Sequence, residues 1–158
     1  MKETLTQADE AYMRMALEEA ARAAADGDVP VGAVLVRMTT GEILSTGRNT
    51  REVMQTALGH AEINAIQNAC ATLGSWRLED CALYVTLEPC PMCAGAILHA
   101  RIPRVVCGAM DPVAGAMGSV WAIHRHPVES KHTKLETGCL EEECKRLLQE
   151  FFQARREN

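Results

Sequence analysis

The chain has 158 residues, of which 47% are hydrophobic, and a formal net charge of -5 at pH 7. This length and composition suffice for one sizeable core, so we expect a single domain spanning residues 1–158. Neither a secretory signal nor a run of transmembrane length occurs, which predicts a cytoplasmic protein without a membrane partner, and the negative charge argues against nucleic-acid binding through a general basic surface.

The first third of the sequence predicts a helix followed by a β-hairpin. Residues 6–26 carry apolar side chains at helical spacing, and Gly27 follows at a position where helices often end in a left-handed residue. Residues 31–37 and 42–46 are β-compatible runs separated by a turn-like segment. The polar stretch 47–59 has no periodicity, so we expect a long loop of the kind that lines binding sites.

The remaining sequence predicts alternating helices and strands. Residues 82–87 and 104–107 are apolar runs typical of buried strands, and a helical pattern over 91–100 between them makes the two strands parallel. Residues 60–73 predict a further helix. Residues 134–137 predict a last short strand, followed by a helix with Arg155 and Arg156 at its end. The predicted fold is a three-layer α/β/α sandwich with a central mixed sheet.

Two cysteines and a histidine at helix starts predict a metal site. Cys90 and Cys93 stand at positions i and i+3 where a helix begins, so both thiolates can reach one ion, and the positive end of the helix dipole favours their ionised form. His60 opens another helix. Three protein ligands leave the fourth tetrahedral position of zinc open to water, as in catalytic sites. We therefore expect one Zn²⁺ per chain, bound by His60, Cys90 and Cys93.

Glu62 is the candidate proton carrier of this site. In a continuous helix Glu62 and His60 would point about 200° apart. If His60 instead lies in the extended cap of the helix, the Glu62 carboxylate can approach a water molecule on the metal and shuttle protons. Two alternatives stay open at this point: Cys90 and Cys93 as a redox pair, and a zinc-binding module without catalysis.

Several segments together resemble the bacterial tRNA-specific adenosine deaminases of the cytidine/deoxycytidylate deaminase superfamily. These segments are VPVGAV at 29–34, HAE at 60–62, LYVTLEPCPMCAGA at 83–96, GAMGS at 115–119 and FFQARR at 151–156. The resemblance implies a cytidine-deaminase-like sandwich, a homodimer, and hydrolytic conversion of adenosine to inosine at the wobble position of a tRNA anticodon stem-loop. It also implies zinc ligation by the three side chains above and a catalytic role for Glu62.

The resemblance further implies substrate-binding roles for Asn49, Arg155 and Arg156. Asn49 matches an asparagine that contacts the purine, although an asparagine is also common in turns. Arg155 and Arg156 match a basic tail that contacts tRNA, although they also suit the end of any helix. Residues 55–59 (QTALG) depart from the Asp-Pro-Thr-Ala common in the family. Because the zinc motif also fits enzymes of free guanine or cytosine, a free-nucleobase deaminase remains the alternative.

Overall fold

The protein is built on one five-stranded mixed sheet, seen in a computed structural model that describes residues 5–125 and 133–157. The strand order is β2-β1-β3-β4-β5. β1 (Gly32–Arg37) pairs antiparallel with β2 (Ile43–Arg48) and with β3 (Cys81–Leu87). β4 (Arg104–Ala109) and β5 (Lys134–Glu136) extend the sheet parallel to β3. The predicted hairpin and the predicted parallel pair are both confirmed.

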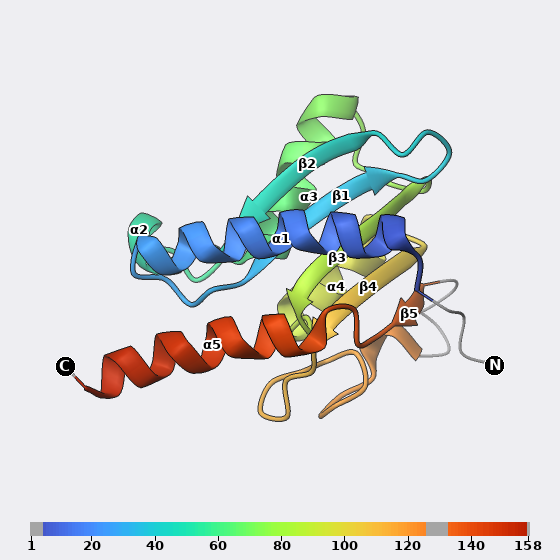
Figure 1. The fold of residues 1–158 in the computed structure, drawn as a ribbon. Helices are drawn as coiled ribbons and strands as arrows, with labels where there is room; N and C mark the ends of the chain where they lie inside the picture. The colour runs from blue at the N-terminus through green and yellow to red at the C-terminus, as the bar shows by residue number, and fades with distance from the viewer. Residues whose placement is uncertain (1–4, 126–132, 158) are drawn as a thin grey trace.

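Helices cover both faces of the sheet (Figure 1). α1 (Gln7–Ala25) and α5 (Glu141–Arg156) lie on one face, and α3 (Ala61–Leu73) and α4 (Pro91–His99) lie on the other. A short 3-10 helix spans Ile123–Arg125. This arrangement confirms the predicted three-layer sandwich.

Alternating strand residues supply two hydrophobic cores, one on each face of the sheet. In β1, Leu35 belongs to the core under α3 and α4, whereas Val34 and Val36 belong to the core under α1. Ala16 of α1 and Cys144 of α5 are buried in this second core. All seven cysteines are free thiols, as their odd number and apolar surroundings predicted.

The predicted loop 47–59 is wrong in two respects. β2 continues to Arg48, and a four-residue helix, α2 (Arg51–Met54), follows it. The carboxylate of the buried Asp28 accepts hydrogen bonds from the backbone N–H groups of Glu52 at 2.8 Å and Val53 at 3.2 Å. Asp28 thus caps α2, whose own cap residue, Thr50, makes no side-chain hydrogen bond to the helix. A contact across more than twenty residues leaves no trace in local periodicity.

A buried ionic cluster joins α1 to three strands. The carboxylate of Asp9 accepts hydrogen bonds from the Tyr84 hydroxyl at 2.6 Å and from two guanidinium nitrogens of Arg104 at 3.0 and 3.1 Å. Arg104 also forms a bidentate pair with Glu136 at 2.8 and 2.9 Å. Burial opposes ionisation of Asp9, but the hydrogen bonds from Arg104, the Thr6 backbone and Tyr84 outweigh it and hold the Asp9 pKa well below its usual range.

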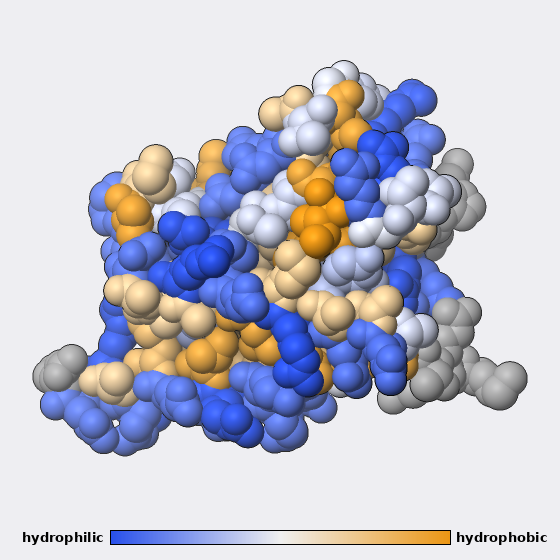
Figure 2. All heavy atoms as spheres, turned by 45° about the horizontal axis from the view of Figure 1, so that its top comes forward, coloured by the Kyte–Doolittle hydropathy of each residue, from blue (hydrophilic) through white to orange (hydrophobic). Residues whose placement is uncertain are grey.

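The surface is a mosaic rather than uniformly polar. On the face shown in Figure 2, hydrophobic patches appear between hydrophilic side chains. Each helix within residues 5–125 and 133–157 is too short or too polar to cross a bilayer.

Candidate metal centre

Three potential ligands meet where α3 and α4 begin. His60 is the cap residue of α3, with the extended backbone angles φ −92° and ψ 148°. Cys90 is the cap residue of α4, Pro91 is its first residue, and Cys93 stands in its first turn. β3 ends at Leu87, three residues before Cys90, so the two cysteines lie at the carboxyl end of a central strand. The structure therefore brings together the three residues that the sequence predicted as ligands.

The donor atoms are spaced as a tetrahedral zinc ion requires. Nδ1 of His60 lies 3.5 Å from Sγ of Cys90 and 3.4 Å from Sγ of Cys93. The ligand atoms of all three residues lie within 4.8 Å of one another. Zinc bonds to sulfur and nitrogen at tetrahedral angles would separate the two atoms by about 3.6 Å. Two thiolates and one neutral imidazole are a donor set that suits Zn²⁺, so the residues fit the ion.

The two sulfurs and the imidazole also influence each other's ionisation. A hydrogen bond from the Cys93 thiol, opposed by burial and aided by His60, lowers the pKa of Cys90 to about 4. The same hydrogen bond, together with burial, raises the pKa of Cys93. The hydrogen bond with Cys90 raises the pKa of His60, with burial acting in the opposite direction. Cys90 is therefore the more acidic of the two thiols.

Glu62 lies beside the three donors and is only 4% exposed. Since His60 belongs to the extended cap, Glu62 is not carried to the opposite side of a continuous helix, and the condition for its approach to the site is met. Burial raises the pKa of Glu62 to about 7. The interaction of its carboxylate with Cys93 and the charge of His60 lower the pKa of Glu62, whereas the charge of Cys90 raises it. A carboxyl group in this range can both accept and donate a proton near neutral pH.

A pocket of about 230 Å³ opens at the centre. Asn49, whose position the sequence singled out, lies in its wall together with Arg51. The side-chain oxygen of Asn49 accepts a hydrogen bond from the Arg51 backbone N–H at 3.0 Å, so the residue is a turn asparagine and a pocket residue at once. The full lining consists of Val29, Val31, Asn49, Arg51, His60, Ala61, Glu62, Leu87, Glu88, Cys90, Asp111 and Ala114.

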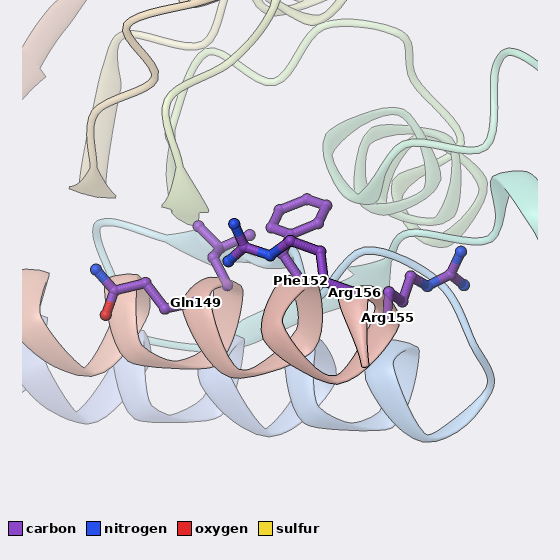
Figure 3. A pocket seen from close by; sticks show the side chains of 5 residues that line it. Gln149, Phe152, Arg155 and Arg156 are labelled. Atoms are coloured by element: carbon purple, nitrogen blue, oxygen red, sulfur yellow. The ribbon is translucent and has the colours of Figure 1, made fainter. Parts of the chain in front are cut away.

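Arg155 and Arg156 lie outside this pocket, along a groove of about 570 Å³ on α5. Figure 3 shows their side chains pointing in different directions, with Arg156 turned back along the helix near the ring of Phe152. Arg155 donates a hydrogen bond to the carbonyl of Gly27 and stacks on Phe151 at 4.6 Å. Asp28, the next residue, caps α2 at the pocket rim. The tail thus contacts the turn between α1 and β1, and the residue after that contact is bonded to α2.

Sequence reasoning missed Glu88, Asp111 and Arg51 in the pocket lining. Glu88 is 3% exposed, although it carries a charge and lies two residues before Cys90. Burial opposes its ionisation, but hydrogen bonds from Ser119 and from the backbone of Asp111 and Met117 lower its pKa. A charged residue between an apolar strand and a cysteine motif is the only signal that the sequence offers for it.

Comparisons with known proteins agree with this geometry. Residues 6–109 match the family model for the cytidine and deoxycytidylate deaminase zinc-binding region. The tRNA-specific adenosine deaminase of Bacillus subtilis is 46% identical over 91% of this chain and 88% of its own length. The enzyme of the same name from Haemophilus influenzae is 46% identical over 94% of this chain and 86% of its own length.

Solved structures resemble the fold as well. One from a study of A-to-I editing by tRNA:A34 deaminases superposes with a TM-score of 0.83 and 40% identity, covering 87% of this chain and 99% of the other. A guanine deaminase from Nitrosomonas europaea superposes with a TM-score of 0.78 and 26% identity, covering 94% of this chain and 86% of the other.

Proposed function

The chain belongs to the cytidine and deoxycytidylate deaminase family, and we propose that it hydrolyses adenosine to inosine at the wobble position of tRNA. The observation that carries this proposal is the meeting of His60, Cys90 and Cys93 with the buried carboxylate of Glu62 in one pocket. Three side chains would hold the metal, and the fourth would handle protons. This division of roles is that of a hydrolytic deaminase rather than of a redox pair.

The ligand side chains would bind Zn²⁺ through Nδ1 of His60 and the two sulfurs. When bound, the ion acts as a Lewis acid that makes a water molecule more acidic and more nucleophilic. The N-terminus of α4, which carries both Cys90 and Cys93, favours their thiolate forms. The backbone carbonyl of His60 accepts the N–H of Asn64 at 3.0 Å, which holds His60 at the cap of α3.

Glu62 moves the protons of the reaction in this proposal. Deamination consumes one water and releases one ammonia, so one proton of the water must pass to N1 of the adenine and the other to the departing amino group, while the oxygen of the water becomes O6 of inosine. The Glu62 carboxylate accepts the first proton from the attacking water and delivers it to N1, and then transfers the second to the amino group. Its burial excludes bulk water from this transfer.

The rest of the pocket would bind the extruded base. Val29 and Val31 would provide apolar surface against the purine ring. The side-chain oxygen of Asn49 accepts the Arg51 backbone N–H, and its side-chain NH₂ group would donate a hydrogen bond to the purine. Arg156 would contact a phosphate along α5. Arg155 donates to the carbonyl of Gly27, so it would contribute to RNA binding by holding the tail against the turn between α1 and β1.

We also propose a homodimer that works in the cytoplasm. An apolar hollow of about 660 Å³ lies between α4 and the segment around Trp121, and its lining includes Leu98, Ile123 and Trp121, which is 49% exposed. A second copy of the chain would bury these side chains. The seven free thiols suit a reducing compartment, where mature tRNA is also present.

The test is inosine formation in an arginine tRNA that carries adenosine at the wobble position. We expect nucleoside mass spectrometry to find inosine after incubation with the zinc-loaded protein, and none in the same tRNA with guanosine at that position. The tRNA affinity should also fall steeply with added salt, because phosphate contacts release counterions.

A free-nucleobase deaminase is the second candidate. The similarity to a guanine deaminase structure and the net charge of -5 favour it. Release of ammonia from free guanine or cytosine, with no inosine in the tRNA, would establish this candidate in place of the first.

A further inference from the structure

The carboxylate of Glu88 holds together the segment 111–119, which follows β4. One carboxylate oxygen of Glu88 accepts hydrogen bonds from the backbone N–H of Asp111 at 2.9 Å and from the Ser119 hydroxyl. The other oxygen accepts from the backbone N–H groups of Met117 and Ser119, each at 3.0 Å. A single buried side chain thereby satisfies four donors that are spread over nine residues.

The segment is packed directly against this carboxylate. A Cβ atom on Gly115 would lie 2.3 Å from Cδ and from Oε1 of Glu88. The N–H of Ala116 donates to the carbonyl of Pro89, the residue before Cys90, at 2.8 Å. The backbone of 111–119 is therefore tied to both residues that precede the first cysteine of the metal centre.

The same segment forms one wall of the substrate pocket through Asp111 and Ala114. The Asp111 side chain turns inward to its own segment and accepts from the N–H groups of Val113 at 3.0 Å and Ala114 at 3.2 Å. Asn49 and Arg51 line the same pocket, so the shape of the pocket depends on the backbone conformation of 111–119. The position of Ala114 then depends on hydrogen bonds that end at Glu88.

We propose that Glu88 is a positioning residue that fixes the pocket wall for the substrate nucleoside and sets substrate binding. This inference rests on the proposed function for the identity of the substrate. A carboxylate suits the role because it offers only acceptors, and two oxygens can each take two hydrogen bonds. A glutamine would place an NH₂ group where one of the two oxygens stands, so at least one of the N–H donors would lose its acceptor.

The experiment compares Glu88→Gln with Glu142→Gln, which makes the same change of charge on the exposed surface of α5. In Glu88→Gln we expect the amides of Asp111, Met117 and Ser119 to exchange with deuterium about 10-fold faster or more, because hydrogen bonds to a charged acceptor are lost. We expect KM for the tRNA substrate to rise about 10-fold with kcat changed by less than about 3-fold. Zinc content and the pH profile of kcat should match those of the wild type, and Glu142→Gln should change none of these quantities.

A milder variant keeps the inference testable if Glu88→Gln does not fold. Ser119→Ala removes one of the four donors and leaves three N–H groups on the carboxylate. We expect it to raise KM about 3-fold at unchanged zinc content. An unchanged KM in a folded Ser119→Ala with faster amide exchange would show that the wall does not set binding.

Three results with Glu88→Gln also overturn the inference. Loss of zinc in folded Glu88→Gln would assign Glu88 to the metal centre, and a fall of kcat with a shifted pH profile would assign it to proton transfer. Unchanged protection of the three amides would show that the carboxylate does not hold the segment. Failure of the proposed function is a separate outcome. If the wild-type protein forms no inosine, the deuterium exchange of the three amides can still be measured, and KM of wild type and variants is then compared with free guanine as substrate.

Discussion

Gly47→Ala tests whether the sheet positions the metal ligands. Gly47 lies in β2, beneath the first turn of α3, and the two backbones approach closely there. A Cβ atom on residue 47 would lie 2.3 Å from the carbonyl oxygen of Ala61 and 2.6 Å from the amide nitrogen of Ala65. Restoring ordinary van der Waals contact moves the start of α3 away from the sheet by about 1 Å, and His60 and Glu62 move with it.

The expected effect follows from two tolerances. Overpacking of a close-packed interior lowers the free energy of unfolding by roughly 1 to 3 kcal/mol. Metal-ligand distances in a good site hold to within about 0.2 Å, so a displacement of His60 by about 1 Å misplaces one of the three ligands. We therefore expect Gly47→Ala to be destabilised by about 2 kcal/mol without zinc, and to bind zinc at least about 10-fold more weakly.

Urea denaturation of the zinc-free protein measures the first effect, and competition with a chromogenic chelator measures the second. Gly95→Ala is the matched control, since a Cβ there meets no atom within 4 Å and α4 gains a better helix former. It should keep wild-type zinc affinity. If Gly47→Ala binds zinc as tightly as Gly95→Ala does, the packing of α3 on β2 does not position His60.

Three further predictions concern stability, the ligands and RNA binding. Asp9→Asn should lower the free energy of unfolding by about 3 kcal/mol at pH 7, because it breaks a buried ion pair. Because the pKa of Asp9 is lower in the folded than in the unfolded state, its stabilising effect is present above about pH 4 and is lost at lower pH. The free energies of unfolding of wild type and Asp9→Asn, measured by urea titration, should therefore converge as the pH falls below about 4. A difference that stays constant with pH would contradict this. Cys93→Ala should abolish zinc binding in elemental analysis, whereas Cys70→Ala, at a half-buried thiol away from the centre, should retain it; full zinc occupancy in Cys93→Ala would remove that ligand. Arg156→Ala should weaken tRNA binding and reduce the salt dependence by about one counterion, and an unchanged slope would place this side chain outside the RNA contact.

Local periodicity predicted most of the fold. The pattern of residues 6–26 gave the first helix to within one residue at each end, because Thr6 caps α1 through a hydrogen bond from the Asp9 backbone at 3.1 Å. The two apolar runs gave β3 and β4, because strands buried on both faces have no polar alternation. Local patterns could not predict α2, because its cap comes from the distant Asp28. They could not predict the Asp9 cluster either, because Tyr84 and Arg104 lie 75 and 95 residues after Asp9 in the chain.

The candidate site divides along the same line. His60, Cys90 and Cys93 follow from ligand chemistry and helix starts, and the extended cap at His60 answers the question of how Glu62 reaches the site. The position of Glu88 between an apolar strand and a cysteine motif is visible in the sequence, but its role is not, because that role depends on a segment that lies 23 to 31 residues further along the chain. The substrate roles of Asn49, Arg155 and Arg156 stay predictions.

The central claim is that Glu62 moves protons at a metal centre that it does not help to hold. The most direct measurement compares Glu62→Gln with Glu18→Gln, an exposed residue of α1, for inosine formation in tRNA and for zinc content. We predict that Glu62→Gln keeps one zinc per chain and loses at least about 100-fold in kcat, as loss of a general acid-base does. Inosine formation at the rate of Glu18→Gln, with zinc still bound, would contradict the claim.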